Sequence, residues 1–134
     1  MSAIKIALGL GCDRNTPLAT VEQAIKEALA ACQSTLTNVK AVASIDLKSD
    51  EPALQQLAQQ QGWKIHFYAA EELAKVDVPN PSETVRKHTG TPSVSEAAAL
   101  LAARTEKQNL IIEKHRMRGP DGRNATVSIA RIPE

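Results

Sequence analysis

Three short segments of this sequence carry most of the polar side chains that could take part in chemistry. They span residues 9–14, 46–51 and 93–96, and they supply Gly9, Gly11, Cys12, Arg14, Lys48, Glu51, Ser93, Ser95 and Glu96. Arginine, lysine and the free amides of a helix N-terminus bind carboxylate and phosphate groups, and glycine lets a ligand approach the backbone closely. We therefore predict a binding site for a ligand with several carboxylates. In the alternative, Arg14 and Lys48 pair with neighbouring acidic residues on a solvated surface.

Three residues of this set are candidates for catalysis. Glu51 or Glu96 could serve as a general base, and Cys12 could serve as a nucleophile if nearby positive charge lowered the pKa of its thiol. No histidine lies near Cys12 in the sequence, so nucleophilic catalysis is the weaker hypothesis. Glu96 also has a structural interpretation, because it is the third residue after Ser93 and the two fit a capping box at a helix N-terminus. The sequence leaves open whether the chain is an enzyme.

Patterns typical of metal and nucleotide sites are missing. The three histidines are far apart and show no metal-ligand spacing, so we predict no metal and no cofactor. Arg14 stands where a dinucleotide-binding fingerprint would have its third glycine, and there is no phosphate loop ending in Gly-Lys-Ser/Thr. A basic turn near the C-terminus, with Arg116, Arg118 and Arg123, could contact phosphate. Charged residues at a strand edge also serve to discourage pairing with other chains.

The composition limits the class of protein. A hydrophobic content of 43% in 134 residues is enough for a buried core, so we expect a single domain over residues 1–134. The formal net charge of +1 gives no overall field that would attract nucleic acid or an anionic membrane. Trp63, Phe67 and Tyr68 are the only aromatic residues, too few to stack a series of bases. With no signal peptide, no membrane-spanning run and only two cysteines, the chain is expected to be cytoplasmic.

Alternating strand and helix patterns surround the polar segments. Apolar and β-branched stretches predict strands at residues 4–8, 39–45 and 64–68, and an antiparallel hairpin of residues 110–115 and 125–132. Helices are predicted to begin at Thr20, near Pro52, at Ala70 and at Ser93. This order predicts an α/β fold of three layers, α/β/α, with a mainly parallel sheet and a C-terminal antiparallel hairpin. Loops that follow parallel strands gather at one edge of the sheet, where the three polar segments are expected to meet.

The polar segments also resemble those of a known family. The strings Gly9-Leu10-Gly11-Cys12-Asp13-Arg14, Ser44-Ile45-Asp46-Leu47-Lys48-Ser49-Asp50-Glu51 and Ser93-Val94-Ser95-Glu96-Ala97-Ala98-Ala99-Leu100 are similar to those of the CobE/CbiG C-terminal domain family of cobalamin biosynthesis. The resemblance covers essentially the whole chain, includes Pro79 and a late strand with Lys114, and is closer to the stand-alone CobE-type members. It implies that Lys114 belongs to the functional surface together with the residues named above.

The resemblance implies a role in building the corrin ring, with a tetrapyrrole or corrinoid intermediate as ligand and other enzymes of the pathway as candidate partners. In longer relatives the domain is the C-terminal part of cobalt-precorrin-5A hydrolase, which opens a ring lactone and releases acetaldehyde. This chain begins at the domain's first strand, so we expect a carrier or accessory role rather than the complete hydrolase reaction. A cofactorless hydrolase or isomerase acting on a precorrin is the alternative. A nucleotide- or RNA-binding domain is a third hypothesis.

Overall fold

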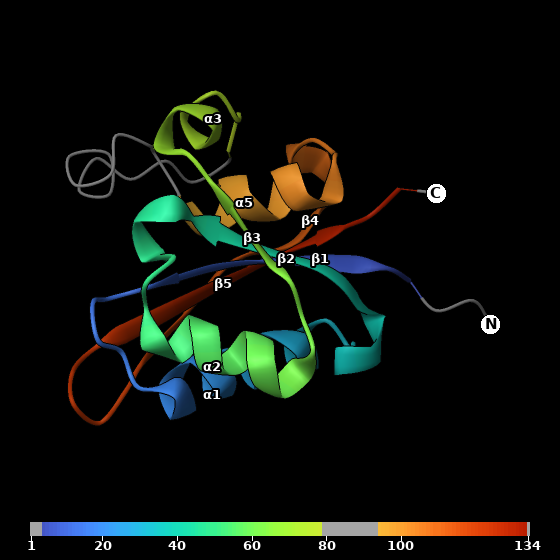
Figure 1. Cartoon of the computed structure of the whole chain (residues 1–134). Coiled ribbons are helices and arrows are strands. Elements are labelled where there is room, and N and C mark those ends of the chain that lie inside the picture. Colours follow the sequence, from blue (N-terminus) through green and yellow to red (C-terminus); the bar gives the residue numbers. More distant parts are fainter. Residues whose placement is uncertain (1–3, 79–93, 134) are drawn as a thin grey trace.

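The protein is built on a single sheet. The computed structural model describes residues 4–78 and 94–133 (Figure 1). Its five-stranded sheet has the order β3-β2-β1-β5-β4. The strands are β1 (Ile6–Cys12), β2 (Val39–Ile45), β3 (Ile65–Tyr68), β4 (Leu110–Arg118) and β5 (Asn124–Arg131). Strands β1, β2 and β3 are parallel, and β5 runs antiparallel to both of its neighbours, β1 and β4.

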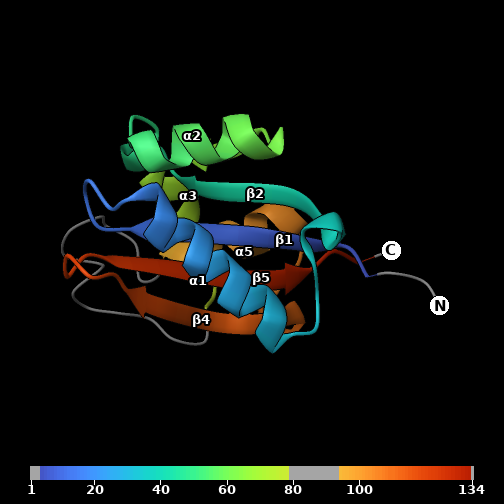
Figure 2. The same ribbon diagram turned by 90° about the horizontal axis from the view of Figure 1, so that it is seen from below.

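Helices cover both faces of the sheet. The longer ones are α1 (Leu18–Ala31), α2 (Pro52–Gln61), α3 (Ala70–Ala74) and α5 (Val94–Ala103). Short 3-10 turns, η1 (Leu36–Asn38), η2 (Asp46–Lys48) and η3 (Lys107–Asn109), precede strands or helices. Helices α1 and α2 lie on one face, and α3 and α5 lie on the other (Figures 1 and 2). The predicted α/β fold, with its three layers and C-terminal antiparallel hairpin, is confirmed.

The hydrophobic core is divided in two by the sheet. The cluster under α1 and α2 includes Leu8, Leu10, Ile25, Leu54 and Ile129, which are all at most 3% exposed. The cluster under α3 and α5 includes a few large residues, such as Leu73 and Leu100, but consists largely of alanines, with a run from α5 packed on Ala7, Ala43 and Ala130. Small side chains on both surfaces let the backbone of α5 lie close to the sheet. This half of the core therefore depends on close backbone approach more than on large side chains.

The helix ends were predicted with mixed success. Pro52 occupies the first turn of α2, and Gly62 ends that helix in the left-handed conformation with φ 69°, as its position predicts. The predicted start of α1 at Thr20 is wrong, because the helix begins at Leu18 after Pro17. Thr20 is 3% exposed and packs against Gly119, in the turn between β4 and β5. That contact between distant residues leaves no local trace in the sequence.

Strand β1 is longer than predicted. We expected a strand at residues 4–8, but β1 continues to Cys12. Strand β5 pairs with its full length, from Ile6 with Arg131 to Cys12 with Ala125. Gly9 is needed inside the strand for a packing reason. A Cβ atom at this position would overlap the carbonyl oxygen of Ser95 and lie 2.6 Å from the backbone nitrogen of Ala99, both in α5.

The two strand glycines should therefore respond differently to substitution. We expect Gly9→Ala to lower the free energy of unfolding by about 2 kcal/mol or more, because α5 must move away from the sheet. Gly11→Ala is the matched control, since among the described residues its Cβ would meet nothing closer than the Thr126 Cβ at 3.8 Å. Urea unfolding of both variants measures the difference. Equal effects would contradict the close approach of α5 to Gly9.

Candidate functional site

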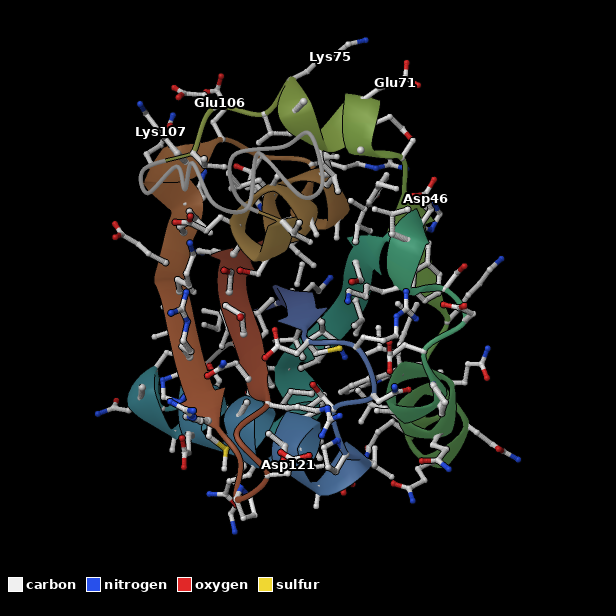
Figure 3. All side chains as sticks on the ribbon, turned by 90° about the vertical axis from the view of Figure 1, so that its left-hand side faces the viewer. Asp46, Glu71, Lys75, Glu106, Lys107 and Asp121 are labelled. Atoms are coloured by element: carbon white, nitrogen blue, oxygen red, sulfur yellow. The ribbon has the colours of Figure 1, made fainter. Side chains whose placement is uncertain are left out.

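The carboxyl edge of the sheet, where β1 and β2 end, carries the polar residues singled out by sequence. Figure 3 looks onto this edge, with α5 on one side of the sheet and α1 and α2 on the other. The residues divide into two groups. The loop cluster, formed by the connections after β1 and β2, contains Cys12, Arg14, Lys48, Asp50 and Glu51. The helix cluster, between α5 and the sheet, contains Ser95, Glu96, Lys114 and Ser128.

Arg14 joins the two connections of the loop cluster. Its guanidinium lies 2.8 Å from Asp50 Oδ1 and 2.9 Å from Glu51 Oε2, and it also donates to the Leu47 carbonyl at 2.8 Å. Glu51 is fully buried, and its second oxygen accepts the backbone N–H of Asn15 at 2.7 Å. Arg14 thus pairs with acidic neighbours, which is the alternative that the sequence left open. Its main action in this arrangement is to hold the two connections together.

Arg14→Ala is expected to destabilise the fold by about 1–3 kcal/mol, because the buried Glu51 carboxylate loses its cationic partner. The matched control is Asp50→Ala, which removes the other ion pair of Arg14. Asp50 is 77% exposed, so we expect a change within about 0.5 kcal/mol. Thermal or urea unfolding gives both values. A larger effect for Asp50→Ala than for Arg14→Ala would show that the buried carboxylate is unimportant.

The turn between β4 and β5 is fixed to the same edge. Asp13 Oδ2 accepts the backbone N–H of Asn124 at 2.7 Å, and Arg123 Nε donates to the Arg14 carbonyl at 3.1 Å. Arg123 also pairs with Asp121 at 3.0 Å. This arginine of the basic turn therefore has a role in holding the loop after β1. Charge at the turn does not by itself indicate a phosphate site.

Cys12 lies on the face of the sheet that packs under α1 and α2. Burial raises the pKa of its thiol from 9.0 to about 11, and the nearby Lys48 ammonium opposes this shift without cancelling it. The Glu51 and Asp13 carboxylates raise the pKa further, and Arg14 lowers it. The structure thus brings Lys48 and Cys12 together as expected. At neutral pH the sulfur is a protonated thiol, a poor nucleophile.

We expect Cys12 to react slowly with iodoacetamide at pH 7 in the native protein, and the rate to rise as the pH approaches about 11. Only the thiolate attacks the reagent, and in the denatured chain the thiolate should form near the ordinary pKa of 9.0. Peptide mass spectrometry of native and denatured samples over a pH series follows the modification. A native Cys12 that reacts faster than the denatured one at pH 7 would instead indicate an activated nucleophile.

The helix cluster buries charged and polar groups beneath α5. Glu96 is fully buried, and its Oε1 lies 4.0 Å from Lys114 Nζ, whose side chain is 20% exposed. The hydroxyls of Ser95 and Ser128 lie 2.9 Å apart, and Ser128 donates to the Glu113 carbonyl at 2.6 Å. Burial of an ion pair in an alanine-rich core is unfavourable unless the charges are well satisfied. Such a pair at a strand edge is a candidate functional group.

A bulge in β4 directs the side chains beyond this cluster. Ile112 pairs with Ile129 and His115 pairs with Val127, so Glu113 and Lys114 both lie opposite Ser128. After the bulge, His115 Nε2 lies 2.8 Å from Glu27 Oε1 of α1. Met117 also lies on the α1 side of the sheet, where it packs against the core cluster under α1 and α2.

Because side chains alternate along a strand, Arg116 and Arg118 lie on the opposite face, together with Lys114. Arg116 is paired with Thr126, which is paired with Gly11 of β1. This face, just beyond the first turn of α5, is here called the basic shelf and consists of Gly11, Lys114, Arg116, Arg118 and Thr126.

The structure sorts the predicted residues as follows. Gly11, Ser95, Glu96 and Lys114 come together on the α5 face, and Gly9 lies under α5. Cys12, Arg14, Lys48 and Glu51 come together on the side of the loops that lead into α1 and α2. Ser93 lies outside the described residues, so its capping box with Glu96 stays a prediction.

Sequence reasoning did not include Arg116 and Arg118 in the site. Strand alternation was a usable signal for them, but the bulge that sets the face was not visible.

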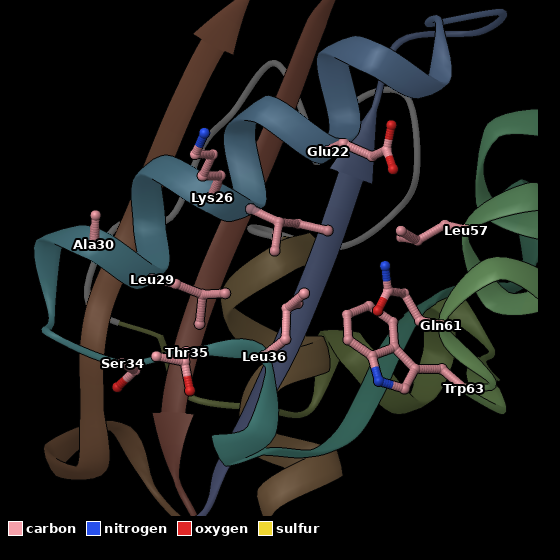
Figure 4. Close-up of a pocket in the computed structure, with 11 residues that line it drawn as sticks. Glu22, Lys26, Leu29, Ala30, Ser34, Thr35, Leu36, Leu57, Gln61 and Trp63 are labelled. Carbon is pink, nitrogen blue, oxygen red and sulfur yellow. The ribbon is translucent and has the colours of Figure 1, made fainter.

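A separate apolar cavity of about 460 Å³ lies between α1 and α2 (Figure 4). Leu29, Leu36, Leu57 and Trp63 are among its lining residues, and Lys26 is its only cation. It is therefore poorly suited to a ligand with many carboxylates. In residues 4–78 and 94–133, no group of His, Cys, Asp and Glu is placed to hold a metal ion. The helices of these same residues include none that is long and apolar enough to cross a membrane.

Comparison with known proteins identifies the family. The family model described as "Cobalamin synthesis G C-terminus" matches residues 6–130. The chain belongs to this family. It is 38% identical over 128 residues to "Cobalt-precorrin-5A hydrolase" of Priestia megaterium, which covers 96% of this chain and 32% of that protein. It is 38% identical over 111 residues to "Protein CobE" of a Sinorhizobium species, which covers 81% of this chain and 71% of that protein.

A solved structure supports the same assignment. The crystal structure of CobE, "a protein from the cobalamin (vitamin B12) biosynthetic pathway", is similar with a TM-score of 0.77 and 31% sequence identity, over 97% of this chain and 92% of that chain. The predicted family is thus confirmed, and the chain is a cobalamin biosynthesis protein of the CobE/CbiG type. It spans about a third of the length of the Priestia hydrolase, so the activity of that whole protein does not transfer directly.

Proposed function

We propose that this protein binds a carboxylate-rich tetrapyrrole intermediate of corrin synthesis on the basic shelf and passes it to another enzyme of the pathway. The observation that supports this most strongly is the position of Lys114 on the strand face that also carries Gly11 and Thr126. Among the described residues, a Cβ at Gly11 would make only ordinary van der Waals contact with Thr126, at 3.8 Å, so no described side chain crowds the strand backbone there. Lys114 lies beside the first turn of α5, 4.0 Å from Glu96.

The chemistry of such a ligand fits the shelf. Its broad macrocycle needs a flat surface, which the strand backbone at Gly11 and Thr126 provides. Its acetate and propionate arms need cationic and N–H donors, which Lys114 and the amides at the start of α5 supply. Lys48, half-buried at the same edge, is proposed to contact a further arm. Arg14 and Glu51 support this surface by fixing the loops, and they are not proposed as direct contacts.

Lys114→Ala should weaken binding of a corrin intermediate about 10- to 100-fold, the equivalent of one charge-assisted contact. The matched control is Lys107→Ala, since Lys107 lies near the other end of β4 and pairs with Asp77 at 2.8 Å. Anaerobic titration followed by the pigment's absorbance measures the affinity of each variant for a panel of early and late corrin intermediates. Thermal melting checks that each variant is folded. Equal affinities for the wild type and Lys114→Ala would refute binding at Lys114.

A second candidate function is a cofactorless hydrolase or isomerase. It is favoured by the fully buried Glu96 beside Lys114 and by 38% identity to a cobalt-precorrin-5A hydrolase. Glu96 would act as general base, because it lies beside Lys114 of the shelf, whereas Glu51 belongs to the loop cluster, where Arg14 and Asn15 bind it. Mass spectrometry and absorbance spectroscopy of the pigment after the same incubation decide between the two functions. A carrier returns the pigment with unchanged mass and spectrum, whereas a hydrolase changes its mass and an isomerase changes its spectrum at constant mass. In either enzyme, Glu96→Gln abolishes the change.

A further inference from the structure

We infer that Arg116 and Arg118 recognise neighbouring carboxylate arms along one edge of the ligand and so set its specificity. This inference rests on the proposed function, because it concerns the same shelf. It adds two residues that no sequence pattern assigned to the site. It also names the chemical feature that the shelf selects, which is a high density of free carboxylates along one side of a flat macrocycle.

The bulge in β4 sets the face of the sheet on which the two arginines lie. The bulge opposite Ser128 leaves His115 and Met117 on the α1 face, which places Arg116 and Arg118 on the α5 face with Lys114. Arg116 is next to Thr126, and Thr126 is next to Gly11, so the arginines lie on the same strand face as Gly11. Without the extra residue at the bulge, these side chains would point to the α1 face instead.

Arg116 and Arg118 differ in their partners from the other two arginines at this edge of the sheet. Arg14 and Arg123 are held by acidic side chains and carbonyl groups that stabilise the loops. Arg116 and Arg118 are exposed, and within residues 4–78 and 94–133 neither forms an ion pair. The side chain of Arg118 lies against Gly122, 3.5 Å from the position that a Cβ would take there. These two guanidinium groups are therefore available to an external anion.

The spacing of the two arginines along β4 also supports the inference. Arg116 and Arg118 are two residues apart on the strand, so their Cα atoms lie about 7 Å from each other. Long, flexible side chains can bring both guanidinium groups onto an acetate and a propionate on the same pyrrole ring. A guanidinium binds a carboxylate through two parallel N–H bonds, which a methyl group in place of the acetate cannot accept. The pair therefore distinguishes ligands by the number of adjacent carboxylates.

Two porphyrins test this directly. Uroporphyrin carries an acetate and a propionate on each pyrrole ring, and coproporphyrin has methyl groups in place of the acetates. We expect the wild type to bind uroporphyrin more tightly, by fluorescence titration at fixed ionic strength. The variant with Arg116→Gln and Arg118→Gln should lose about 10-fold or more in affinity for uroporphyrin and much less for coproporphyrin. Arg131→Gln, an exposed arginine at the other end of β5, is the control that should change neither.

The outcomes separate this inference from the proposed function. If the wild type binds uroporphyrin and the double variant binds it equally well, the role of the arginines is refuted. The proposal that the ligand binds on the basic shelf is then unaffected. If corrin intermediates bind but uroporphyrin does not, the arginines again do not select by carboxylates. If neither class of pigment binds, both proposals fail together. A single variant, Arg116→Lys, keeps the charge but loses the two parallel N–H bonds, and it should lie between the wild type and the double variant.

Discussion

The close contact between α5 and Gly9 determines most of what lies at the carboxyl edge. The helix backbone rests on the strand, with the Ser95 carbonyl and the Ala99 amide where a side chain at residue 9 would be, so the first turn of α5 lies directly over Gly9. Ser95 thereby reaches Ser128, and Glu96 reaches Lys114. A longer side chain at residue 9 would raise the helix and separate both pairs. The alanines of α5 that face Ala7 and Ala43 serve the same close approach.

The charged groups of the fully buried Glu96 and the partly buried Lys114 carry a desolvation cost. An aliphatic pair of similar size would pack in this core without desolvating two charged groups. Lys114 is also at a bulge, so the strand has given up regular pairing with β5 to place it there. The buried Glu96 and the bulge thus meet at one ammonium group, and this is the physical basis for proposing that the ligand binds on the α5 side of the edge and not at Arg14.

The sequence predicted the elements well wherever the signal was local. Pro52 and Gly62 mark the ends of α2, and the alternation of Thr126 and Ser128 with Val127 and Ile129 marks β5. The sequence predicted the elements poorly where contacts with distant residues determine them. The extent of β1 depends on pairing with β5, and the burial of Thr20 depends on Gly119. The sequence predicted that the polar segments meet at one edge of the sheet, and the parts of them that the structure describes do lie there, but the sequence could not separate the two faces of that edge.

Arg14 and Arg116 show why residue type alone could not identify the surface that we propose for the ligand. Arg14 follows a strand, next to glycines and a cysteine, and has the sequence context of an anion-binding residue. In the fold it meets Asp50, Glu51 and the Leu47 carbonyl, which satisfy its guanidinium. Arg116 has the context of an ordinary charged strand edge, yet the bulge turns it toward Gly11, away from any described acidic partner. Whether an arginine is satisfied within the fold thus depends on the acceptors that the fold brings to it, and those acceptors come from other elements of the chain.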